Sequence, residues 1–165
     1  MKIRDICVMS ILGIVLFVAQ ISLAVIPNIE LISLLVILFT LIYRKRIIGI
    51  LCVFILIEGL TYGFGTWFLM YLYIWPLLAL ISYLFRNMKS TTGWAVLSGA
   101  FGLFFGALCS IVYFVIGGIG GGISYFIAGI PFDLLHCAGN FILALLLFRP
   151  LHKVLETLEK RLSRM

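Results

Sequence analysis

The chain has 165 residues, of which 64% are hydrophobic and 11% are charged, and its formal net charge is +6. Its mean hydropathy of +1.28 excludes a water-soluble domain, because such a chain has too few polar residues to cover a core. Six membrane spans of about 20 residues each would use about 120 residues. That leaves no room for a soluble catalytic or nucleotide-binding domain. The positive charge does not indicate nucleic-acid binding, because the basic residues stand beside the ends of the predicted spans.

The basic residues predict the membrane topology. The 12 Lys and Arg residues form four clusters: Lys2 and Arg4; Arg44, Lys45 and Arg46; Arg86 and Lys89; and Arg149, Lys153, Lys160, Arg161 and Arg164. Each apolar stretch between clusters is long enough to cross a bilayer twice. Positively charged loops stay in the cytoplasm. The sequence therefore predicts an all-α integral membrane protein, a compact six-transmembrane-helix bundle with both termini cytoplasmic.

In chain order, the predicted spans are 5–26, 29–43, 47–63, 67–85, 93–116 and 124–148. Together they place residues 1–149 in one transmembrane domain. The outer turns are Pro27–Asn28 and the glycine-rich segment 117–122, since these residue types favour turns. Pro76 is expected to kink the fourth span.

Residues 150–165 are predicted to form a cytoplasmic amphipathic tail. Its apolar residues recur at helical spacing on one face and its charged residues take the other. The apolar set is Leu151, Val154, Leu155, Leu158 and Leu162. Such a helix fits the cytoplasmic membrane surface or a docking surface for a partner.

Three acidic residues, Glu30, Glu58 and Asp133, lie away from the predicted cytoplasmic side. A charge near the bilayer centre costs at least about 2.5 kcal/mol, so such residues face a cavity or the bundle interior. Glu30 stands at the outer mouth of the second span, where a helix N-terminus suits a carboxylate. It fits either a capping role or a ligand contact.

Glu58 is predicted at or just beyond mid-membrane in the third span. Tyr62 falls on the same helical face, and Trp67, Tyr71 and Trp75 follow in the fourth span. One carboxylate in an aromatic box that opens outward suits a flat, partly polar ligand. An interfacial aromatic belt is the alternative, but it accounts for the aromatic residues and not for Glu58.

Asp133, His136 and Asn140 follow one another at i, i+3 and i+7 in the sixth span and therefore share a face. This face fits contact with a ligand or an Asp–His–Asn network packed between helices. A proton relay is a further alternative.

Small residues form a strip along the fifth span, which lets helices approach closely. The strip comprises Ala95, Gly99, Gly102, Gly106 and Ser110. Packing within the bundle is expected, and contact with another membrane subunit is the alternative.

The sequence contains no Walker A, HExxH or GxSxG motif and no Cys/His pair with metal-ligand spacing. We therefore expect no catalytic residues, no metal and no cofactor. Uphill transport on ATP would need another subunit to hydrolyse it.

The chain resembles the substrate-binding S components of energy-coupling-factor (ECF) vitamin transporters. The whole chain resembles them in size and six-helix topology, and the likeness is sharper in 25–31, with the sequence VIPNIEL, and in 129–136, with the sequence GIPFDLLH, followed by Asn140.

The resemblance implies a multi-pass protein of the bacterial plasma membrane. It would bind a vitamin-like ligand from outside and dock on a membrane coupling (T) subunit driven by two cytoplasmic ATPases. S components often carry alanines four apart on the first helix for this docking. Here no clean pair of this kind is present: Ser10 and Gly13 stand three apart, and Ala19, Ser22 and Ala24 lie further out. The docking surface is therefore the weakest part of the likeness.

Two other functions remain open. A non-catalytic membrane scaffold of the cell-shape machinery, similar to the small membrane subunit of the rod-shape complex, would use the small-residue strip and the tail to hold partners. An intramembrane enzyme would use Asp133 and His136 as an acid–base pair, but it lacks a recognisable nucleophile.

Overall fold

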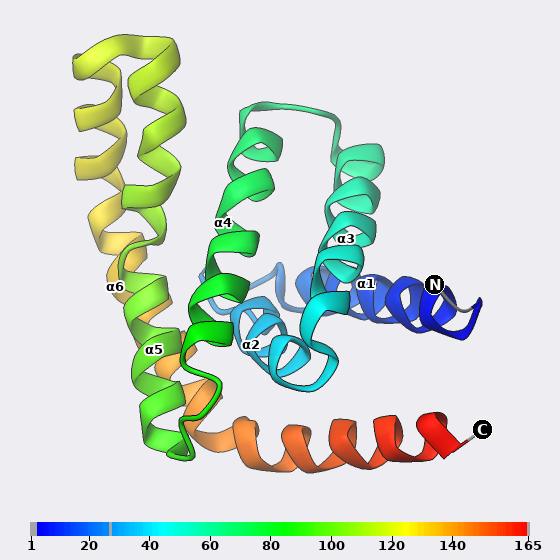
Figure 1. The fold of residues 1–165 in the computed structure, drawn as a ribbon. Helices are drawn as coiled ribbons and strands as arrows, with labels where there is room; N and C mark the ends of the chain where they lie inside the picture. The colour runs from blue at the N-terminus through cyan, green and yellow to red at the C-terminus, as the bar shows by residue number, and fades with distance from the viewer. Residues whose placement is uncertain (1–2, 27, 165) are drawn as a thin grey trace.

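The computed structural model describes residues 3–26 and 28–164, and in this part of the chain every regular element is helical (Figure 1). The elements are α1 (Ile3–Leu23), α2 (Ile32–Tyr43), the short 3-10 helix η1 (Arg44–Arg46), α3 (Ile47–Tyr62), α4 (Thr66–Leu84), α5 (Thr91–Leu103) and α6 (Phe105–Arg164). The predicted all-α class is confirmed. Pro27, half of the predicted outer turn, lies outside the described residues.

Within the described residues, three stretches are long and apolar enough to cross a membrane: Ile3–Leu23, Thr66–Leu84 and Thr91–Ser163. They indicate a membrane protein. The count of six spans stays a prediction, because α2 and α3 have 12 and 16 residues, fewer than the roughly 20 that cross a hydrocarbon core. Pro76 lies inside α4, which remains one helix.

The third hairpin differs from the prediction in two places. The helix breaks at Phe104, so the predicted span 93–116 is divided between α5 and α6. The predicted turn at 117–122 is helical except at Gly118, whose φ of 65° and ψ of −168° form a sharp corner. Glycine adopts this positive φ without the strain that a Cβ would add. In Figure 1 the hairpin formed by the first part of α6, which follows the break at Phe104 and turns at Gly118, rises beyond the α3–α4 hairpin.

The core is built around α2. Ten of its 12 residues are buried, and its neighbours include α4 and α6. A helix that is apolar on every side is stable only when other helices surround it. This central position brings the start of α2, with Glu30 just before it, into contact with the middle of α6.

The small-residue strip packs α5 against α6, which confirms the expected role within the bundle. A Cβ added to Gly102 would lie 2.8 Å from the backbone carbonyl of His136, and one added to Gly99 would lie 3.1 Å from Phe141. The two helices therefore approach so closely that their backbones touch at glycine.

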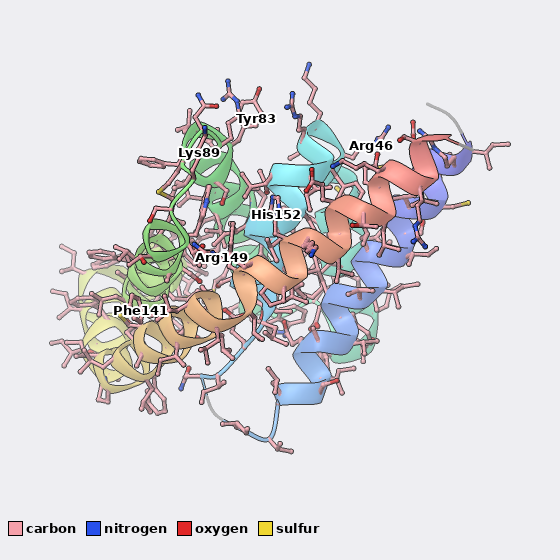
Figure 2. All side chains as sticks on the ribbon, turned by 90° about the horizontal axis from the view of Figure 1, so that it is seen from below. Arg46, Tyr83, Lys89, Phe141, Arg149 and His152 are labelled. Carbon is pink, nitrogen blue, oxygen red and sulfur yellow. The ribbon has the colours of Figure 1, made fainter. Side chains whose placement is uncertain are left out.

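The tail lies across the lower end of the bundle (Figures 1 and 2). Arg46 of η1 bridges Glu159 of the tail at 3.1 Å and Asp5 of α1 at 3.0 Å. Arg4 donates from Nη1 to the Leu162 carbonyl oxygen at 2.8 Å. The ion pair of Arg46 with Glu159 joins the tail to η1, and the hydrogen bond of Arg4 to Leu162 joins it to α1.

The predicted apolar face of the tail is divided between two environments. Leu151 and Leu155 pack against the core, whereas Val154 and Leu158 are 55% and 46% exposed. The reason is that the contacts of the tail with α1 and η1 set its rotation, so only part of the apolar face meets the bundle.

These contacts also place residues from all four basic clusters at one end of the molecule. Arg4 and Arg46 meet the tail, and Arg149 donates from Nε to the Thr91 hydroxyl beside Lys89. Figure 2 views the protein from this end. The shared end agrees with the positive-inside pattern.

Replacing Glu159 by Gln is expected to loosen the tail, because Arg46 then loses one of its two carboxylate partners. Trypsin cleavage at Lys160 and Arg161 of the detergent-solubilised protein should accelerate several-fold. Glu156→Gln is the matched control, since Glu156 pairs with Lys160 inside the tail itself. Equal cleavage rates in the two variants would show that the Arg46 contact does not hold the tail.

Candidate ligand-binding site

A cavity of about 270 Å³ lies between the α1–α2 connection, α4 and α6. Its polar lining residues are Gln20, Asn28, Glu30, Tyr71, Trp75 and His136. Four of these, Glu30, Tyr71, Trp75 and His136, are among the residues chosen from the sequence. They come from three separate parts of the chain, so the fold brings them together.

Glu30 connects the start of α2 to α6. Its Oε2 accepts the backbone N–H of Ser33 at 2.8 Å, and its Oε1 lies 3.2 Å from Nε2 of His136. The first contact is an N-terminal cap, which suits a carboxylate at the positive end of the helix dipole. Glu30 therefore caps α2 and lines the cavity at once, and the two alternatives raised by the sequence are compatible.

Tyr71 and Trp75 form the aromatic part of the cavity lining. The rings of Tyr71 and Trp75 are 5.4 Å apart and nearly perpendicular, and Gln20 donates from Nε2 to the Tyr71 hydroxyl at 3.1 Å. Trp75 is 2% exposed, and its indole N–H has no hydrogen-bond partner within 3–26 and 28–164. A buried donor without a partner is costly, but this nitrogen is itself buried, so Trp75 lines the cavity through other atoms of its side chain.

His136 completes the site from α6. Its ring contacts the ring of Phe105 with centroids 4.9 Å apart, and Phe105 also approaches Trp75 at 5.8 Å. A second cavity of about 330 Å³ shares Phe105 and Asn28 with the first and is lined by Asp133. The Phe105 ring therefore lies where the two cavities adjoin.

The three polar residues of the sixth span do not form the self-contained Asp–His–Asn network that the sequence left open. Asp133 accepts the backbone N–H of Gly106 at 2.9 Å, and His136 meets Glu30. Asn140 donates to the Ser33 hydroxyl at 3.1 Å. Their shared face meets the first turn of α6, the α1–α2 connection and α2 in turn, so each side chain finds a different partner.

The remaining predicted site residues lie outside the first cavity. Glu58 is 2% exposed, and within the described residues its Oε1 has no hydrogen-bond partner. Tyr62 is 57% exposed and faces Phe17, with ring centroids 6.4 Å apart. Trp67 is not part of the cavity lining, and its ring centroid lies 5.4 Å from that of Tyr71. The predicted aromatic box therefore divides, and Tyr71 and Trp75 face the cavity with Glu30 instead of Glu58.

Sequence reasoning missed Gln20, Asn28 and Phe105. Gln20 carried a usable signal, because it is the only amide side chain in the predicted span 5–26 and polar residues inside spans mark functional positions. Asn28 and Phe105 carried none, since their places depend on how the α1–α2 connection and α6 meet.

The two expected docking residues differ in their surroundings. A Cβ added to Gly13 would lie 2.7 Å from the Val53 side chain, so Gly13 belongs to the contact between α1 and α3, and Ser10 is partly exposed. The exposed face of α1 carries apolar side chains instead, among them Ile11 at 60% and Val18 at 52% exposure.

Replacing Glu58 by Leu is expected to stabilise the protein. A buried polar atom without a partner costs about 1–3 kcal/mol, and leucine removes it at similar volume. The measurement is thermal unfolding in detergent, with Glu58→Gln as the control that keeps a polar group in place. A lower unfolding temperature for Glu58→Leu than for the parent would mean that the carboxyl makes a stabilising contact.

Within the described residues, no group of three or more His, Cys, Asp or Glu side chains is placed to hold a metal ion. No protein-family model, no curated protein and no solved structure matches this chain. The functional argument therefore rests on the cavity and on the sequence.

Proposed function

We propose that the chain is the membrane-embedded substrate-binding subunit of an ECF-type importer, which captures a vitamin or related small nutrient from outside. The observation that carries the proposal is the cavity that joins Glu30 and His136 to Tyr71 and Trp75. The buried contact between Glu30 and His136 adds little by itself to the stability of a helical membrane protein. Binding of a ligand would explain why these polar and aromatic side chains lie together in one cavity.

The cavity indicates the class of ligand. Its volume of about 270 Å³ lies near the lower end of small-molecule sites, which favours a compact ring over a large macrocycle. The aromatic side chains of Tyr71 and Trp75 suit a ring on the ligand, while the Glu30 carboxylate accepts a donor or attracts a positive group. A pyridine- or pyrimidine-type nutrient has this combination.

The same proposal covers topology and partners. Six spans with both termini in the cytoplasm of a bacterial cell would put the basic end of the molecule inside the cell. The exposed apolar face of α1 would meet a membrane coupling subunit, and two cytoplasmic ATPases would supply the energy. The absence of a Walker A motif from the sequence agrees with a subunit that hydrolyses no ATP.

A pull-down from native membranes in mild detergent tests the assembly. Recovery of one multi-helix membrane protein together with ABC-type ATPases would support the transport subunit. Recovery of wall-synthesis and cell-shape proteins without ATPases would reject it in favour of the scaffold.

Tryptophan fluorescence tests the ligand. The chain has three tryptophans, and of these Trp75 lines the cavity. A panel of pyridine- and pyrimidine-ring nutrients should quench the fluorescence of the purified protein. Quenching should disappear in Trp75→Phe and persist in Trp67→Phe. Quenching that is the same in both variants would place the ligand elsewhere.

A further inference from the structure

A third cavity, with a different character, lies at the basic end of the molecule. It has a volume of about 430 Å³ and lies between the α4–α5 connection and the start of the tail. Its lining includes the cationic side chains Arg86, Lys89, Arg149 and Lys153, against one carboxylate, Glu156. Figure 2 shows Lys89, Arg149 and His152 at this end. The excess of positive charge attracts an anion.

The basic side chains are arranged by specific contacts. Arg149 donates from Nε to the Thr91 hydroxyl at 2.9 Å, which orients the guanidinium while its two terminal nitrogens stay available. Thr91 is the first residue of α5, so the positive end of a helix dipole also faces the cavity. Glu156 is engaged by Lys160 at 2.8 Å, which reduces its repulsion of an anion.

The aromatic residues of the cavity do not offer a stacking surface for a nucleobase. The rings of Trp94 and Phe148 are stacked at 5.8 Å, and His152 stacks on Phe148 at 5.7 Å. Trp94 is 1% exposed and Phe148 8%, so each covers the other. The chemistry that remains is recognition of a phosphate group by arginine and lysine.

The surroundings identify the source of the phosphate. Leu84 and Phe85, directly before Arg86, are 65% and 54% exposed, and Leu146, one turn before Arg149, is 65% exposed. A ligand held by these cations therefore lies next to exposed apolar protein surface. An acidic phospholipid matches both parts, with the headgroup phosphate among the cations and the acyl chains along the helices.

We propose that this cavity binds the headgroup phosphate of an acidic phospholipid such as phosphatidylglycerol. The proposal does not depend on the ligand cavity beside Glu30 or on the transport function. It requires the chain to be embedded in a membrane with its basic end at the lipid headgroups, and it makes the α4–α5 connection and the tail one lipid-bound unit.

The test compares two variants that each remove two positive charges. Lys89→Gln with Lys153→Gln removes charge from the cavity, and both side chains are exposed, so the fold is expected to survive. Lys45→Gln with Arg161→Gln removes the same charge outside it. Thermal unfolding of each protein in detergent is measured with phosphatidylglycerol, with phosphatidylcholine of the same chain length, and with inorganic phosphate at matched ionic strength.

Phosphatidylglycerol should raise the unfolding temperature of the parent and of the Lys45/Arg161 variant by several degrees, and that of the Lys89/Lys153 variant by less than half as much. Phosphatidylcholine and inorganic phosphate should have little effect. An equal shift in both variants would overturn the proposal in favour of general attraction to the basic end. An equal shift with inorganic phosphate would overturn the lipid assignment and leave a soluble phosphate. If the cavity double variant does not fold, Lys153→Gln against Arg161→Gln gives the same comparison.

Discussion

Replacing Glu30 by Gln is expected to weaken binding of the fluorescence-quenching ligand by about 10- to 100-fold. The change removes the charge of a carboxylate that the Ser33 N–H and His136 hold at the edge of the cavity. A hydrogen bond to a charged group contributes about 1.5–3 kcal/mol, and each 1.4 kcal/mol is a factor of ten in affinity. Quenching titrations give the dissociation constant of each variant.

Glu58→Gln is the matched control for this experiment. It makes the same substitution at the other predicted carboxylate, which is buried outside the cavity lining. We expect its affinity to stay within about twofold of the parent, a difference of less than 0.5 kcal/mol. A loss of binding in Glu58→Gln with none in Glu30→Gln would move the site back to the aromatic box predicted from the sequence.

Replacing Gly102 by Ala is expected to lower the free energy of unfolding by about 1–3 kcal/mol, the usual cost of overpacking. The new methyl group would lie 2.8 Å from the carbonyl carbon and oxygen of His136. Because those atoms belong to the backbone of α6, the helices must move apart. Thermal or denaturant unfolding in detergent measures the effect, and ligand affinity should fall as well, since His136 moves with its backbone.

Gly120→Ala is the control, because within the described residues its added Cβ has no neighbour within 4 Å apart from the adjacent residues and the backbone of its own helix. Gly120 is helical, so alanine should leave the stability unchanged or raise it by up to about 1 kcal/mol. If the two variants are equally stable, α5 and α6 are not in backbone contact at Gly102.

Local patterns were sufficient for the helical class and for several individual side chains. The close approach of α5 and α6 could be predicted because small residues recur along one helical face. Glu30 and His136 were each identified as polar groups in apolar surroundings. Their pairing was not predictable, since 106 positions separate them and no local pattern relates the α1–α2 connection to α6.

The predicted aromatic box shows the limit of helical periodicity. Glu58 and Tyr62 share a face of α3 by spacing, yet Glu58 is buried and Tyr62 is 57% exposed. Helical spacing predicts which residues share a face. It does not predict which of them pack against a neighbouring helix and which stay exposed. The glycine-rich corner is a second case, since only Gly118 needed a non-helical conformation and its neighbours remained in the helix.

The sequence by itself determined that this is an apolar helical protein with its positive charge gathered at the ends of apolar stretches, because composition and helical period are local properties of the chain. Only the tertiary structure decided which carboxylate meets the histidine, which aromatic rings face a cavity and which cations surround another. Those outcomes depend on the central position of α2 and on the tail crossing the basic end. Both result from packing between distant segments, where burial of apolar surface sets the arrangement and the polar side chains find their partners within it.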